Sequence, residues 1–398
     1  MLFLPPIGLM VLVAFRLLSG DEPVLLKLFS PYQSTPLVTA CAVLAVLATV
    51  RRFEFVPVLL LGAALEAIRV ALLLSEGRNV IESWSTFGQG FWYASIAVAL
   101  WHIVQSSPAQ RWQEVDRALL RVALPLAVSL ALFGLQLTVL NIPTTFDNVL
   151  YAFDGLLGPP VATFVAGLCR NHQALRVLAI IAYQSLWLML SVFVFVQCQT
   201  DQRMAVRLMS RYILLGIIGW LLYFVLPAID PGGAFWDVYG DQLPSPNEVS
   251  LDRLAVQNGH PRNAMPSLHM SWALLLAMEG RRMGKAWASI GLAYVFITAF
   301  ATLGVREHYL IDLVVAVPFT VSMYAVSRLF CRRQGRTELF AAAAGGAAMT
   351  ALLLITIRFG TEALRGAPWV ARALVVGAVS LSLALHFLAE RQARLSPP

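Results

Sequence analysis

The sequence predicts an all-α protein, a polytopic membrane bundle of about 12 spanning helices, from its composition and from the length of its apolar runs. Hydrophobic residues make up 59% of the 398 residues and charged residues only 13%, against about 25% charged in a typical soluble domain. A spanning helix needs about 20 apolar residues, and many runs reach that length. Because the runs are continuous rather than alternating, helices are favoured over a barrel. A disordered chain, a collagen-like chain and a secreted disulfide scaffold are excluded.

Twelve apolar segments of spanning length can be drawn along the chain. They lie near 3–19, 36–50, 55–75, 87–105, 119–141, 175–198, 208–229, 266–282, 286–304, 308–330, 338–357 and 368–389. The first has neither the basic start nor the small-residue cleavage site of a secretory signal, so we expect it to be a span. Two stretches do not span: 142–174, expected to be an interfacial helix, and 230–265, the longest loop.

Basic residues in the short loops predict the orientation of the bundle. Arg and Lys are concentrated in alternate loops, for example at Arg51, Arg281 and Arg332, which the positive-inside rule places in the cytoplasm. Both termini are then cytoplasmic, and 142–174 and 230–265 lie outside. We therefore interpret the net charge of +7 as a topology and lipid-headgroup signal rather than a nucleic-acid footprint. A multi-pass protein of a bacterial-type inner membrane is expected.

A polar motif opens the eighth span. Residues 262–269 read RNAMPSLH, and Pro266 suits the first turn of a helix. Ser267 and His269 then lie in the opening turn at the outer surface. Free backbone N–H groups, the Ser hydroxyl and the adjacent Arg262 and Asn263 make a ready anion site.

A second motif, GVREHYLID at residues 304–312, opens the tenth span. His308 and Asp312 are four apart, so we expect them on one helix face. A carboxylate next to an imidazole fixes its tautomer and raises its pKa, as a nucleophilic or general-base histidine requires. Spans 8 and 10 begin on the same side of the membrane, so His269 and His308 can face each other.

Each motif alone has an ordinary structural explanation, a helix cap for the first and a chance pair for the second. Their coincidence at neighbouring span starts, with Arg262 and Arg306 beside them, favours a functional site, because ionisable residues at membrane depth are costly. For Arg306, a contact with a lipid headgroup is an equal alternative to phosphate binding.

The paired histidine motifs resemble those of the type-2 phosphatidic acid phosphatase superfamily, most closely its inositol phosphorylceramide synthase branch. The stretches YFVLPA at 223–228 and FD…FDG at 146–155 are similar to that branch too. The resemblance covers about residues 118–330. It implies a six-span catalytic core at 118–331, between four N-terminal spans at 1–117 and two C-terminal spans at 332–398.

The resemblance also implies roles for the site residues. His308 attacks phosphorus and forms a phosphohistidine, Asp312 orients it, and His269 protonates the leaving group. Ser267 and basic residues bind the phosphoryl oxygens, with no metal or cofactor. The superfamily's first motif, a Lys and an Arg-Pro, is absent, and Ala301-Thr302 replaces an expected Ser-Arg. Arg262, Arg306 and Asn263 are the local candidates for that phosphate clamp.

We therefore expect an enzyme that transfers a phosphoryl or phospho-headgroup from a lipid phosphate or phospholipid. The acceptor, water or an alcohol such as inositol, stays open. One alternative is a twelve-span secondary transporter, which would favour internal repeats and polar sites at the midplane. Another is a non-catalytic lipid-binding protein that retains the motifs. No nucleic-acid partner is expected.

Overall fold

The computed structural model describes residues 50–75, 89–123, 142–236, 239–240, 243–255, 261–330 and 336–395. Helices dominate this part of the chain, beside one two-stranded sheet, so the all-α class is confirmed there. The expected spans 3–19, nearly all of 36–50 and much of 119–141 lie outside the described residues. The chain forms two compact units, residues 1–129 with 180–210 and residues 130–179 with 211–398.

The first unit contains a helical hairpin and a buried ion-pair cluster. Its elements include η1 (Arg52–Glu54), α4 (Phe55–Ser75), α5 (Gln89–Gln105) and α10 (Leu186–Thr200). Helices α4 and α5 pack closely where Gly62 leaves room for Phe91. Glu54 pairs with Arg121 at 2.6 Å and with Arg51 at 2.7 Å between side-chain atoms. Because the Arg121 and Glu54 side chains are both fully buried, the loss of either would leave an uncompensated charge.

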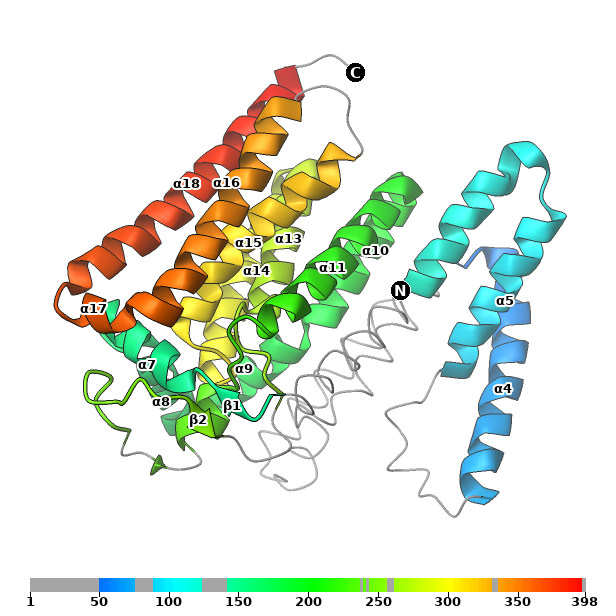
Figure 1. The fold of residues 1–398 in the computed structure, drawn as a ribbon. Helices are drawn as coiled ribbons and strands as arrows, with labels where there is room; N and C mark the ends of the chain where they lie inside the picture. The colour runs from blue at the N-terminus through cyan, green and yellow to red at the C-terminus, as the bar shows by residue number, and fades with distance from the viewer. Residues whose placement is uncertain are drawn as a thin grey trace. The chain divides into compact units, whose positions relative to one another are not determined.

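The second unit contains both histidine motifs, residues 262–269 and 304–312, and Figure 1 labels the helices α13 and α15 that carry their C-terminal ends. Its helices are α7 (Asp147–Leu156), α8 (Val161–Asn171), α13 (Leu268–Met283), α14 (Lys285–Gly304), α15 (Leu310–Leu329), α16 (Arg336–Ile355), α17 (Thr361–Arg365) and α18 (Pro368–Leu395). Two π-helical turns, η3 (Gly232–Trp236) and η4 (Thr356–Gly360), and the strands β1 (Thr144–Thr145) and β2 (Leu254–Ala255) complete it. Helices α9 (Gln173–Gln184) and α11 (Gln202–Tyr223) pass from one unit to the other.

Small residues let the helices of the second unit approach closely. Gly291 of α14 faces the backbone of Ala277 in α13, and Gly346 of α16 faces the backbone of α15 at Pro318. A methyl group at Gly291 would come within 2.6 Å of Ala277 Cα. This is how helices pack in lipid, where van der Waals contact replaces the hydrophobic effect between helices.

Six helices in the described residues are long and apolar enough to cross a membrane, or eight if each of two bent pairs is one span. The structure thus supports a multi-pass integral membrane protein, while the count of about 12 spans is not confirmed. The expected span 266–282 corresponds to α13, a 16-residue helix that is not among the six. Its last turn carries Arg281 and Arg282.

The stretch 142–174, expected to be one interfacial helix, contains two helices. Helices α7 and α8 are bent by 100° and together are apolar enough for a broken span or a re-entrant loop. The expected span 175–198 is likewise divided, with α9 and α10 bent by 47°. The break lies at Ser185, between the two helices, and the hydroxyl of this residue donates a hydrogen bond to the Ala182 carbonyl.

Backbone hydrogen bonds join three distant segments at the end of the unit where α15 begins. The Phe146 N–H donates to the Pro227 carbonyl at 2.8 Å, and the Ala264 N–H donates to the Ala228 carbonyl at 3.0 Å. The YFVLPA stretch therefore links the start of α7 to the loop before α13. Buried side chains, among them Phe153 and Tyr309, pack around this junction.

Candidate active site

The start of α13 is held by Ser267 and tied to α15. Ser267 is fully buried, and its Oγ accepts a hydrogen bond from the Met270 N–H at 3.3 Å, as an N-cap does. Its own N–H donates to the Asp312 carbonyl at 3.2 Å. The two helix starts, one from each histidine motif, are therefore in direct contact.

The structure brings the two histidines and Asp312 together. The ring centroids of His269 and His308 are 6.2 Å apart at an interplanar angle of 62°. His308 Nδ1 lies 3.3 Å from Asp312 Oδ2, which also accepts the Tyr309 N–H at 2.8 Å. His308 precedes α15, which begins at Leu310, so the two residues meet across a helix cap and not along a helix face as expected.

Two aspartates of α7 hold the start of α15. Asp154 accepts hydrogen bonds from the backbone N–H groups of Leu310 and Ile311, at 2.8 and 2.9 Å. Asp147, fully buried, accepts the Tyr309 hydroxyl at 2.7 Å. A carboxylate at a helix N-terminus satisfies its unpaired donors and complements its dipole. Both aspartates therefore position the segment that carries His308.

Sequence reasoning noted Asp147 and Asp154 only within a resemblance and assigned them no role. One signal was available, because two aspartates seven apart share one face of a helix. Nothing in the sequence indicated which helix that face meets.

The turn before His308 has an unusual backbone. Arg306 has φ of 67°, in the left-handed region that a residue with a side chain adopts only at a cost of about 1–3 kcal/mol. The Glu307 N–H donates to Thr302 at 3.1 Å, and the Arg306 carbonyl accepts the Gly232 N–H at 3.1 Å. A Cβ at Gly232 would lie 2.7 Å from the Asp230 carboxylate, so glycine is needed for this contact.

Burial sets the protonation of the turn. It lowers the pKa of His308 to about 4, although a hydrogen bond with the Ala264 backbone and the Asp230 carboxylate both oppose this. A neighbouring carboxylate by itself would raise the pKa of His308. Burial has the larger effect and lowers it. His308 is then neutral at pH 7, the form that a nucleophile requires. Burial also raises the pKa of Glu307 to about 8, with a further increase from Asp230.

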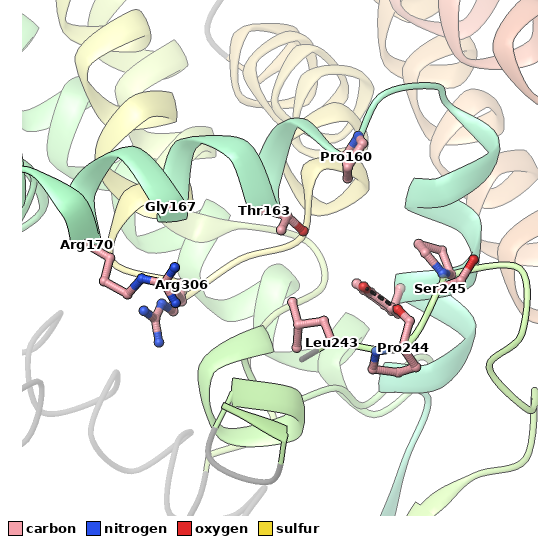
Figure 2. A pocket seen from close by; sticks show the side chains of 10 residues that line it. Pro160, Thr163, Gly167, Arg170, Leu243, Pro244, Ser245 and Arg306 are labelled. Atoms are coloured by element: carbon pink, nitrogen blue, oxygen red, sulfur yellow. Dashed lines mark hydrogen bonds between the residues drawn. The ribbon is translucent and has the colours of Figure 1, made fainter. Parts of the chain in front are cut away.

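A pocket of about 290 Å³ adjoins the second motif (Figure 2). Arg170 of α8 and Arg306 both line it, and Figure 2 labels their side chains. Its other lining residues are Tyr151, Pro160, Thr163, Gly167, Leu243, Pro244, Ser245 and Pro246. The Tyr151 hydroxyl donates to the Pro244 carbonyl at 2.9 Å, which fixes one wall.

The candidate clamp residues have different environments. Arg262 is 1% exposed, and its Nε donates to the Ile142 carbonyl at 2.9 Å, so it also ties the motif to the chain before α7. Asn263 is half-buried in the same loop. Arg306 lines the pocket, together with Arg170, which sequence reasoning did not select. Within the described ranges, no three His, Cys, Asp or Glu side chains are grouped to hold a metal ion.

Comparison with known proteins agrees with the motifs. A family model described as the PAP2 superfamily matches residues 148–326, which include most of α7 and both histidine motifs. Comparisons with curated proteins and with solved structures returned no match. The match supports a likeness to the PAP2 superfamily over this segment, which is less than half of the chain.

Proposed function

We propose that this chain is a lipid-phosphate phosphotransferase that acts through a phosphohistidine, with water or an alcohol such as inositol as the acceptor. One observation carries the proposal: the His269 and His308 rings lie 6.2 Å apart at the adjoining starts of α13 and α15, with Asp312 beside His308. The twelve-span transporter is not favoured, because the family match is to a superfamily of phosphatases.

The chemistry follows from the roles of the two rings. His308 Nδ1 faces Asp312, so Nε2 is the nitrogen that attacks phosphorus. An N–P bond forms and the P–O bond to the lipid alcohol breaks, while His269, protonated when the anionic phosphate of the substrate lies beside it, gives its proton to the departing oxygen. The acceptor hydroxyl then attacks the phosphohistidine, His269 takes the acceptor's proton, and His308 returns to its neutral form.

The developing charge on the phosphoryl oxygens needs donors that are already in place. Ser267 and the backbone N–H groups of the first turn of α13 are candidates, as are Arg262, Asn263 and Arg306. Of these, Arg306 stands out because it lies two residues from His308 in the chain. The loop charge pattern supports a site on the outer face with cytoplasmic termini, and the mechanism uses no metal ion.

The test is phosphate release by three variants on two kinds of substrate, a lipid phosphate and an aryl phosphate. We expect His308→Ala to lose turnover on both and to give no acid-quenched phosphohistidine. His269→Ala should lose about 10²–10⁴-fold on the lipid and recover partly on the aryl ester, whose leaving group needs little protonation. Asp312→Asn should fall between them, with its imidazole present but poorly oriented.

His172→Ala is the matched control, because His172 is exposed at the end of α8 and should keep full activity. Full recovery of His308→Ala on the aryl ester would reverse the assignment of the two histidines. Equal loss of all three variants on both substrates, with normal folding, would refute the mechanism.

A further inference from the structure

We infer that the pocket beside His308 binds a second phosphate-type anion, distinct from the phosphoryl group that reacts. The inference rests on the proposed function for the identity of the reacting centre. Arg170 is its principal recognition residue, and Arg306 lines the same pocket two residues before the catalytic histidine.

Two cations converge on the pocket from separate parts of the chain. Arg170 ends α8, and Arg306 is held in the turn before α15 by its left-handed backbone and by the Gly232 N–H. Both residues line the same pocket, and Figure 2 labels both of their side chains. Two cationic side chains on one pocket lining favour an anion as its occupant. Arginine is suited to phosphate because its planar donors bind two oxygens at once.

The rest of the lining is suited to a headgroup rather than an acyl chain. Thr163 and Ser245 offer hydroxyl groups on other walls, and the volume of about 290 Å³ is at the small end for ligand sites. The proline-rich wall from Pro244 to Pro246 packs against Gly155, where a Cβ would come within 2.5 Å of Pro246. Gly155 directly follows Asp154, so the pocket wall and the support of His308 share one stretch of α7.

The spacing connects the pocket to the reacting centre. Arg306 and His308 are two residues apart, so their Cα atoms lie within about 7 Å. A molecule with two phosphate-type groups can therefore place one at the histidines and the other between Arg170 and Arg306. Two sources have this chemistry: a lipid diphosphate as donor, or a phosphorylated alcohol as acceptor.

Direct binding tests the pocket without catalysis. The probe is methylenediphosphonate, which cannot be hydrolysed, titrated calorimetrically into the purified full-length protein. We expect Arg170→Ala to weaken its Kd by about tenfold to a hundredfold, the range for a lost charge-assisted hydrogen bond, and Arg170→Lys to weaken it less. Arg176→Ala is the control, because Arg176 is exposed on the next helix and does not line the pocket. An unchanged Kd in Arg170→Ala overturns the inference.

Turnover then identifies the source of the anion. If a lipid diphosphate is the donor, Arg170→Ala should lower its kcat/KM by tenfold or more and leave the matching lipid monophosphate within twofold. If the anion belongs to the acceptor, Arg170→Ala should instead lower kcat/KM by tenfold or more for the phosphorylated alcohol and not for the unphosphorylated one. Equal losses on every substrate would place Arg170 at the reacting phosphate and overturn the inference. Arg170-dependent binding in a protein without any turnover would sustain the anion site while refuting the proposed function.

Discussion

Replacing Asp154 with Asn should damage the active site from a distance. Asp154 accepts the N–H groups of Leu310 and Ile311 with its two separate oxygens. Asn keeps one acceptor oxygen and turns an N–H₂ group towards the other donor, so one hydrogen bond is lost and one backbone N–H group is left without an acceptor. A buried donor without a partner costs about 1–3 kcal/mol, and we expect a loss of stability of that size.

The catalytic effect should be separate from this loss of stability. His308 lies two residues before Leu310, the first of the two residues that Asp154 binds, and a shift of about 1 Å in a catalytic group can reduce the rate about 10²-fold. We expect kcat on an aryl phosphate to fall by about ten- to a hundredfold in protein that is still folded, as judged by circular dichroism and thermal unfolding. KM should change less, because the Asp154 carboxyl group binds the backbone of α15.

Asp201→Asn provides the matched control for this substitution. Asp201 also accepts a backbone N–H near a helix start, that of Arg203 at 3.0 Å, but it is exposed. It should lose little stability and no activity. A folded Asp154→Asn variant with unchanged kcat would refute the positioning role. A loss of activity that is fully explained by the fraction of unfolded protein would refute it as well.

Three further outcomes are expected. Activity should survive EDTA, since two histidines supply the chemistry; complete loss on chelation with recovery in Mg²⁺ would contradict the mechanism. Because the pKa of His308 is lowered to about 4, kcat/KM on an aryl phosphate should fall about tenfold per pH unit only below pH 4, and a limb near pH 6.5 would contradict this. Burial raises the pKa of Glu307 from its ordinary value of 4.5 to about 8 in the folded chain, so the contribution of this group to stability is complete below pH 4.5 and is lost as pH rises towards 8. Thermal unfolding midpoints should therefore decrease over that range in the wild type and decrease less in Glu307→Gln; parallel profiles would argue against this titration.

The sequence by itself determined the class of the protein and the local form of its two motifs. In lipid, the backbone N–H and C=O groups of a long apolar run must form hydrogen bonds within the protein, so the composition predicts helices. The N-cap at Ser267 and the meeting of His308 with Asp312 depend on residues at most four apart. Such contacts are set by local geometry, although the actual start of α15 at Leu310 changed the way in which the pair meets.

Only the tertiary structure decided which residues support and surround the histidines. Asp154 meets Leu310 across more than 150 positions, and Arg262 meets Ile142 across 120. Arg170 enters the pocket because α8 packs against α14, the helix that ends just before Arg306. The periodicity and spacing of residues describe one helix at a time and do not indicate which helix faces pack against each other. Burial, too, exists only in the folded chain, and it reverses the pKa shift of His308 that its neighbour in sequence suggests.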